Sequence, residues 1–123
     1  MPFSIYESSE DYLEAILMIK ERKGVVHSID IAEELGYTKA SVSIAMKKLR
    51  ENGYIKMAKT GEITLLEPGE KIAKKTYERH KVLTDFFISI GVDQDTAEDD
   101  ACKVEHDLSE ITFEKLKKHM TKK

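Results

Sequence analysis

Apolar residues recur along most of the chain at the three- and four-residue spacing of amphipathic helices. The pattern changes only in the middle, where two short runs of strand-forming residues flank a turn sequence, Lys59-Thr60-Gly61. The pattern predicts three helices, a hairpin and three further helices, over residues 8–22, 28–35, 38–51, 54–58, 62–66, 69–91, 96–108 and 113–120. The expected fold is therefore mostly α, with one two-stranded wing.

Residues that start and stop helices support these boundaries. Ser8 or Ser9 is expected to cap the first helix, and Gly36 to end the second in a left-handed conformation. Pro68 suits the first turn of the long helix, where its missing N–H costs nothing. No repeat, low-complexity tract or linker separates the elements.

The composition limits the class of protein. The chain has 123 residues, of which 35% are charged and 41% hydrophobic, so one compact domain or two small lobes are expected. No apolar run approaches the roughly 20 residues of a membrane span, and the first residues do not resemble a signal peptide. A cytoplasmic protein with no membrane partner is expected. The single cysteine, Cys102, excludes an internal disulfide.

The net charge of −3 conceals an uneven distribution of charge. Residues 38–60 hold six basic side chains and one acidic side chain, a net +5. Residues 93–110 hold eight acidic side chains and one basic side chain, a net −7. Because phosphate binding depends on local positive charge, the basic segment keeps a nucleic-acid partner open despite the negative total.

A helix-turn-helix is indicated by Ala32, Gly36 and Val42, which stand at relative positions 1, 5 and 11. The small Ala32 lets the second helix of the motif approach, Gly36 makes the turn, and Val42 packs the recognition helix onto the first. An ordinary helical pair with a glycine turn would share this pattern. The hairpin that follows and the local +5 charge favour a winged helix that binds double-stranded operator DNA.

The recognition helix can be oriented at about 100° per residue, which directs Val42 and Met46 inward and Ile44 outward. An exposed isoleucine is often incidental, but in a major groove it can contact a thymine methyl group. The expected DNA contacts, including two lysines on the wing, are Thr38, Lys39, Ala40, Ser41, Ser43, Ile44, Lys47, Lys48, Lys56 and Lys59. One such module reads few bases, so a homodimer on two half-sites is expected.

A second group of residues has the chemistry of metal ligands. Cys102, Glu105 and His106 share one helix face, and Glu98 lies one turn earlier. Asp11 and Glu14 on the first helix, and His80 on the long helix, are further ligand types. Each of these residues alone has an ordinary explanation, such as a cap, a surface histidine or a buried thiol. Their clustering keeps a metal site open.

These motifs resemble the diphtheria toxin repressor (DtxR/MntR) family. The resemblance is carried in order along nearly the whole chain by residues 9–14 (SEDYLE), 30–32 (DIA), 41–43 (SVS), 66–69 (LEPG), 78–80 (ERH) and 99–109 (DDACKVEHDLS). It implies a metal-activated, homodimeric repressor with residues 1–67 as the winged-helix domain and residues 68–123 as the dimerisation and metal-binding domain. The chain resembles the short members, which lack an SH3-like domain.

The family resemblance also implies a mixed ligand set. Asp11 and Glu14 match the manganese-type members, whereas Cys102 matches the iron-type members. His80, Glu105 and His106 match ligands of both types. Glu98 stands where the iron type has an ancillary histidine, and Thr84 replaces an ancillary carboxylate. In the recognition helix, Ile44 replaces a polar residue, so a different operator sequence is expected.

A thiolate favours soft or borderline ions, so Fe(II) is the metal favoured by the sequence, with Mn(II) second; Co(II), Ni(II) or Zn(II) can substitute. Repression of metal homeostasis genes is the expected function. The alternatives are a Mn(II)-responsive repressor, or a winged-helix regulator that senses an organic ligand or oxidation of Cys102. An enzyme is not expected, since no set of nucleophile, base and orienting residue is recognisable.

Overall fold

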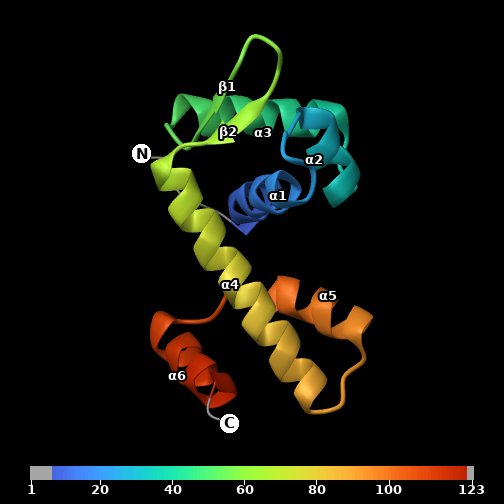
Figure 1. The fold of residues 1–123 in the computed structure, drawn as a ribbon, viewed down its shortest axis with the longest axis vertical. Coiled ribbons are helices and arrows are strands. Elements are labelled where there is room, and N and C mark those ends of the chain that lie inside the picture. Colours follow the sequence, from blue (N-terminus) through green and yellow to red (C-terminus); the bar gives the residue numbers. More distant parts are fainter. Residues whose placement is uncertain (1–6, 122–123) are drawn as a thin grey trace. The chain divides into compact units, whose positions relative to one another are not determined.

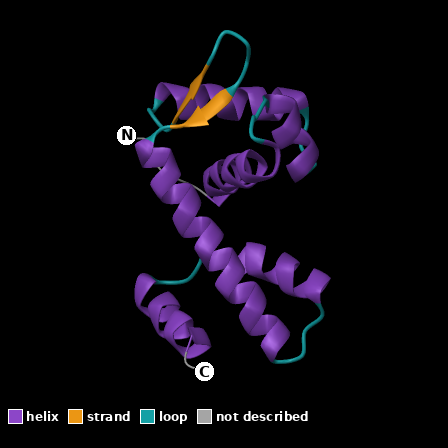
Figure 2. Ribbon diagram, in the orientation of Figure 1, coloured by secondary structure: helices purple, strands orange, loops and turns teal. Residues whose placement is uncertain are grey.

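The computed structural model describes residues 7–121 and confirms a mostly α fold with a two-stranded wing (Figures 1 and 2). The elements in chain order are α1 (Glu7–Lys23), α2 (Ser28–Leu35), α3 (Lys39–Glu51), β1 (Ile55–Met57), β2 (Ile63–Leu65), α4 (Glu67–Ser89), α5 (Gln94–Val104) and α6 (Glu110–Thr121). The chain divides into two compact units, Met1–Lys74 and Lys75–Lys123, and α4 begins in the first and ends in the second. Within the described residues, no helix is long and apolar enough to span a membrane.

The first unit has a continuous apolar core formed by one face of each of its helices and by the wing. Three helices and a hairpin bury residues at the spacing that the sequence predicts, which confirms the helical assignments. The largest of these fully buried side chains are Leu13, Ile16, Ile19, Val26, Ile31, Met46, Leu49, Ile55 and Ile63. This core holds α3 by its buried face and leaves the opposite face exposed.

The helix-turn-helix has the turn that the sequence predicts. Gly36 adopts φ +71° after α2, a left-handed conformation that few residues other than glycine take without strain. Thr38 then caps α3, because its side-chain Oγ1 accepts a hydrogen bond from the backbone N–H of Ser41 at 3.1 Å. The expected cap of α1 is wrong, since Ser8 and Ser9 both lie inside the helix.

The wing is a short antiparallel hairpin with the register Ile55↔Leu65 and Met57↔Ile63. Immediately after it, α4 approaches the chain so closely that Gly69 is required. A Cβ atom at position 69 would overlap the carbonyl oxygen of Tyr54 and meet the side chain of Leu13. The start of α4 is therefore packed tightly against the first unit.

In the second unit, several helix boundaries differ from the predicted ones. Asp93 caps α5 by accepting a hydrogen bond from the N–H of Thr96 at 3.0 Å, so the helix begins at Gln94 rather than at Thr96. The helix ends at Val104, and Glu105, which was expected inside it, lies in the turn that follows. The last helix begins three residues early because Ser109 accepts from the N–H of Thr112. The starts of these two helices are therefore set by capping side chains and not by the apolar spacing.

Candidate metal centre and nucleic-acid interface

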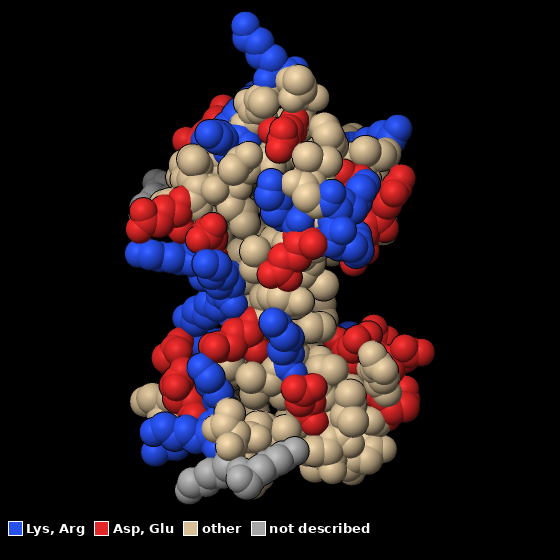
Figure 3. Space-filling model, in the orientation of Figure 1, with Lys and Arg blue, Asp and Glu red and all other residues tan. Residues whose placement is uncertain are grey.

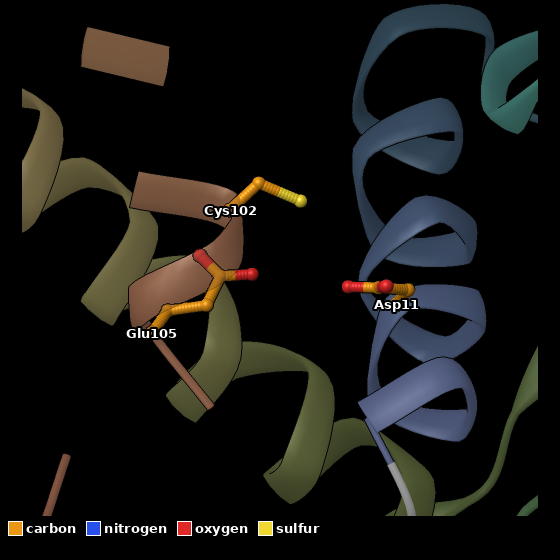
Figure 4. A group of neighbouring side chains, drawn as sticks. All are labelled: Asp11, Cys102 and Glu105. Atoms are coloured by element: carbon orange, nitrogen blue, oxygen red, sulfur yellow. The ribbon is translucent and has the colours of Figure 1, made fainter. Parts of the chain in front are cut away.

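The end of α5 brings a thiol and a carboxylate together. Cys102 lies in the last turn of the helix and is half-buried, and the side chain of Glu105, at its C-terminal cap, is fully buried. The Cys102 Sγ atom and a carboxylate oxygen of Glu105 lie within 4.8 Å of each other. Figure 4 shows the two side chains near each other at the end of α5. Both are ligand types for divalent metals, although Glu105 lies at the end of the helix and not inside it as predicted.

Two histidines flank the buried carboxylate. His80, on α4, places Nδ1 at 3.1 Å from Glu105 Oε2, and His106 places Nε2 at 3.5 Å from Glu105 Oε1. Only 3% of the His106 side chain and 20% of the His80 side chain are exposed. Since an ionised carboxylate is costly to bury without partners, this cluster of polar groups requires compensation. Two imidazoles or a bound cation can supply it.

The donor set fits a divalent transition metal. One thiolate, one carboxylate and two imidazoles offer both soft and hard atoms, a combination that suits Mn(II), Fe(II) and the later first-row ions. The fit rests on residues of a single unit, His80, Cys102, Glu105 and His106. When bound, such an ion would supply a fixed positive charge that Glu105 and the Cys102 thiolate neutralise.

The remaining predicted ligands are on α1 and earlier on α5. Asp11 and Glu14 are on α1, in the first unit, and their three-residue spacing directs them to one side of that helix (Figure 4 shows Asp11). Glu98 is exposed on α5, and its Oε1 accepts a hydrogen bond from Gln94 Nε2 at 3.4 Å. It lies outside the cluster that Glu105 forms with Cys102 and the histidines.

The sequence reasoning missed a buried cation beside the candidate ligands. Arg79 precedes His80 on α4 and is 6% exposed. It donates hydrogen bonds to the carbonyl oxygens of Glu105, at 3.0 Å, and Leu108, at 2.7 Å. A signal was available, because Thr76, Arg79 and Leu83 follow the three- and four-residue spacing of a buried helix face.

The outer face of α3 forms the candidate nucleic-acid interface. Ala40, Ile44, Lys47 and Lys48 are exposed, as the helical arithmetic predicts, and Val42 is fully buried. Ile44 is 60% exposed although it lines a groove between α1 and α3. A large apolar side chain left in solvent between lysines suits contact with a base methyl group and phosphates.

The other predicted DNA contacts are also on the surface. Thr38 and Ser41 are exposed but bonded to each other at the start of α3, with 2.9 Å between Thr38 Oγ1 and Ser41 Oγ. Lys39 and Ser43 are exposed on the first turns of the helix. Lys56 lies on β1, and Lys59 in the loop of the wing. Every residue of the predicted set is therefore accessible.

Charges are more mixed on the surface than along the sequence. In Figure 3, Lys and Arg side chains and Asp and Glu side chains both appear on the visible face of each unit. In the first unit, for example, Arg22 pairs with Glu34 at 2.9 Å, away from α3. The net +5 of residues 38–60 is therefore concentrated on one segment and is not a property of the whole first unit.

Comparison with known proteins finds a matching family model for most of each unit. The model of the iron-dependent repressor N-terminal DNA-binding domain matches residues 4–63, and the model of the iron-dependent repressor metal-binding and dimerisation domain matches residues 66–122. An uncharacterised HTH-type transcriptional regulator of Methanocaldococcus jannaschii is 39% identical over 118 residues, which are 94% of each chain. The HTH-type transcriptional regulator MntR of Bacillus subtilis is 36% identical over 109 residues, or 89% of this chain and 77% of MntR.

A solved structure agrees with the fold. A manganese-dependent transcriptional repressor in complex with manganese superposes with a TM-score of 0.83 and 26% identity, over 91% of this chain and 52% of that one. This chain spans about half the length of that solved chain. The resemblance noted in the sequence is thereby confirmed: the chain belongs to the iron-dependent repressor (DtxR/MntR) family, a family of transcriptional regulators and not of enzymes.

Proposed function

We propose that this protein is a transcriptional repressor that binds operator DNA as a homodimer when a divalent metal is bound. The observation that carries the proposal is the buried Glu105 carboxylate between two imidazoles and near a thiol, in a unit that matches a metal-binding domain. The winged helix, with an exposed lysine-bearing face on α3, supplies the DNA-binding half of the function.

His80, Cys102, Glu105 and His106 would hold the ion, and Asp11 and Glu14 of α1 would complete its coordination. The support for these two is their residue type, their spacing and the family resemblance. Carboxylates from the DNA-binding domain, residues 1–67, would then share the ion with the domain of residues 68–123. If the ion binds more tightly to the domain arrangement that fits the operator than to other arrangements, metal binding would increase operator affinity. The increase would equal the difference in the free energy of metal binding between the arrangements. Glu98 would be an ancillary ligand.

Mn(II) is the metal that the proposal favours for the regulatory signal. Two observations support it: relatives that carry the name MntR, and the manganese complex of a structurally similar repressor. Half of the six proposed donors, Asp11, Glu14 and Glu105, are hard carboxylates that suit Mn(II). Fe(II), which the sequence favours through Cys102, is the second candidate, because the half-buried thiol near Glu105 favours a softer ion.

The DNA contacts follow from exposure and chemistry. Ala40 and Ile44 would meet thymine methyl groups, while Lys47, Lys48 and the wing lysines 56 and 59 would meet phosphates. Lys39, Ser41 and Ser43 would contribute from the first turns of α3, where the positive end of the helix dipole also favours phosphate. The hydroxyl of Thr38 is already bonded to Ser41, so we expect its contribution to come through capping.

The dimer surface would include apolar residues that the second unit leaves exposed. Ile88 is 43% exposed, Ile90 64% and Ile111 75%, unusually high values for isoleucine in a small unit. A second copy of the chain is the occupant that we propose, because the domain model that matches these residues describes dimerisation. Burying them in a dimer would remove this apolar surface from water.

The test begins with double-stranded DNA that the protein, with Mn(II) added, selects from a pool of random sequences. Fluorescence anisotropy then measures affinity for the selected duplex while Mn(II), or Fe(II) under anaerobic conditions, is titrated. We expect Mn(II) to increase affinity at least about tenfold and EDTA to reverse the effect. Tight binding that persists unchanged in EDTA would rule out metal control and leave a sensor of thiol oxidation or of an organic ligand.

His106→Ala and His119→Ala form a matched pair of variants. His119 is an exposed histidine on α6, so its loss should leave the metal response intact, whereas loss of His106 should remove most of it. Cys102→Ala should weaken metal-dependent DNA binding while metal-free, nonspecific binding persists. A larger loss with Fe(II) than with Mn(II) would support Fe(II) as the physiological ion. Unchanged metal-dependent binding in Cys102→Ala would remove Cys102 from the site.

A further inference from the structure

The turn that follows α5 carries two of the proposed ligands, and it has one backbone hydrogen bond of its own, from Asp107 N–H to the Val104 carbonyl oxygen at 3.0 Å. The backbone of residues 105–108 leaves the helix at Val104, where the last carbonyl groups of a helix lack partners within it. The carbonyl oxygens of Glu105 and Leu108, at the two ends of this turn, accept hydrogen bonds from the same atom, Nη1 of Arg79. One guanidinium therefore spans the turn from end to end.

Arg79 is itself held firmly. Its Nη2 lies 3.3 Å from Glu110 Oε2, and its guanidinium carbon lies 5.1 Å from the centre of the buried Phe113 ring. Lys75, at 3.0 Å, and more weakly Arg79 lower the pKa of the Glu110 carboxyl, so it stays ionised opposite the guanidinium. A planar group that serves three acceptors and rests on an aromatic face is a task for arginine, and a lysine ammonium cannot reproduce it.

The clamp and a ligand are adjacent on one rigid helix. Arg79 and His80 are consecutive residues of α4, so the bonds from Arg79 fix the turn relative to the helix that also places His80. His80 Nδ1 meets Glu105 Oε2 at 3.1 Å, and the backbone carbonyl of that same Glu105 is bonded to Arg79. The position of the Glu105 carboxylate thus depends on a backbone that Arg79 holds.

We propose that Arg79 is a positioning residue of the metal site, which fixes the 105–108 turn so that Glu105 and His106 are arranged for the ion before it binds. Preorganisation of this kind raises affinity because less ordering remains when the ion binds. The proposal rests on the proposed function, since it assumes that His80, Glu105 and His106 are ligands. It predicts that Arg79 affects metal affinity without contacting the metal.

The main variant is Arg79→Lys, which keeps the charge but lacks the planar fork. Lys75→Met is the matched control, because Lys75 pairs with the same Glu110 carboxylate from an exposed position and does not bond to the turn. Mn(II) affinity is measured on the whole protein without DNA, from the electron paramagnetic resonance signal of free Mn(II). The thermal unfolding of the metal-free protein is measured in parallel.

We expect Arg79→Lys to weaken Mn(II) binding about tenfold while the metal-free protein is still folded, and Lys75→Met to bind as the unaltered protein does. The Co(II) absorption spectrum gives a second readout, since a displaced turn changes the ligand field and the thiolate charge-transfer band. A purely structural role would lower the unfolding temperature and leave both the affinity and the Co(II) spectrum of the folded protein unchanged. That result would overturn the proposal.

If Arg79→Lys does not fold, Glu110→Gln is the variant that tests the proposal. It removes the charged partner of Arg79 Nη2 and so leaves the guanidinium less firmly held. Glu110→Gln should bind Mn(II) about two- to threefold more weakly than Lys75→Met, and equal affinities would overturn the proposal. Glu105→Gln separates the two hypotheses. If it binds Mn(II) like the unaltered protein, the proposed metal site fails; if it does not bind and Arg79→Lys does so normally, only the role of Arg79 fails.

Discussion

The two units of this protein bury different kinds of side chain. Among the described residues, the first unit buries fourteen apolar residues and one charged residue, Glu14. The second buries four apolar residues, of which Leu83 and Phe113 are the large ones, and four polar or charged residues. These four are Thr76, Arg79, Thr84 and Glu105. Both units leave isoleucines exposed, Ile29 and Ile44 in the first and Ile88, Ile90 and Ile111 in the second.

This difference indicates where each unit obtains its stability. Burial of apolar surface stabilises the first unit from within, at roughly 25 cal/mol per Å². The second unit buries charges that are costly unless they are bonded, so it depends more on what it binds. A rigid DNA-binding unit joined to one whose stability responds to ligands is a sound arrangement for a metal sensor. Four predictions test this contrast.

The largest effect is expected at the tightest contact of the first unit, Gly69. In a helix, Gly→Ala ordinarily stabilises by up to about 1 kcal/mol. Here the added methyl group would overlap the Tyr54 carbonyl oxygen, which belongs to the backbone and cannot rotate away. We expect Gly69→Ala to destabilise the protein by about 3 kcal/mol, measured by urea unfolding followed by circular dichroism.

Glu70→Ala is the control, since it changes the next residue of α4, which is exposed. Its effect should stay within about 0.5 kcal/mol. A Gly69→Ala protein as stable as the unaltered one would show that α4 is not packed tightly against the first unit, and the contrast between a rigid unit and a responsive one would weaken.

The second prediction concerns metal loading, which should stabilise the second unit preferentially. An ion at 100 times its dissociation constant stabilises the state that binds it by about 2.7 kcal/mol. Amide hydrogens that exchange only when the site opens and releases the ion should therefore exchange about 100-fold more slowly in the metal-loaded protein. We expect such amides in residues 101–108 and in the second half of α4. The amides of α3 and β1 should change least. Uniform slowing along the whole chain would contradict the contrast.

The third prediction compares the same substitution in the two units. Ile90→Glu and Ile44→Glu both place a charge on an isoleucine that is at least 60% exposed, so neither should disturb the fold. Ile90→Glu should raise the dimer dissociation constant about tenfold or more, measured by sedimentation equilibrium. Ile44→Glu should leave the dimer intact and abolish binding to the selected duplex. If Ile44→Glu weakened the dimer and Ile90→Glu abolished DNA binding, the proposed assignment of the two surfaces would be wrong.

The fold could be predicted from the sequence wherever an apolar stripe has to face a core. The first three helices and the hairpin are confirmed because their apolar residues pack into one common core. Apart from the cap of α1 and the start of α4, the errors lie at helix ends in the second unit, where Asp93 and Ser109 cap helices earlier than the apolar spacing suggests. The described residues of the second unit bury only four apolar side chains, so few core positions mark where its helices begin and end.

The candidate site could be predicted only in part, for a similar reason. Residue types and spacing identify Cys102, Glu105 and His106 on one short segment, and the resemblance adds His80. Spacing cannot reveal that Arg79 bonds to carbonyl groups of the 105–108 turn, because those acceptors belong to the backbone and exist only once α5 has ended. A pattern of residue types therefore cannot predict hydrogen bonds between a side chain and the backbone of a distant segment.

The smallest effect is expected at Asp30, outside the core of the first unit. Its carboxylate accepts from Lys23 Nζ at 2.6 Å and from the backbone N–H of His27 at 2.9 Å. Lys23 and then the His27 N–H lower the pKa of Asp30 in the folded protein. Because this pKa is lower in the folded protein than in the unfolded chain, where it is about 3.9, the ionised carboxylate stabilises the folded state at pH values above 3.9. This contribution is lost as the pH falls through the pKa of the folded protein. Asp30→Asn should therefore cost about 1 kcal/mol at pH 7.

The pH dependence of that cost separates the charge of Asp30 from its shape. The stability difference between the unaltered protein and Asp30→Asn, measured by urea unfolding from pH 7 downward, should shrink as pH approaches and passes below about 4. Glu33→Gln, an exposed change on the same helix, should show no comparable difference at pH 7. A deficit that stays constant as the pH falls would mean that Asp30 acts through its shape alone. An effect this small at an ion pair, beside the large one at Gly69, is what a unit stabilised by its apolar core should show.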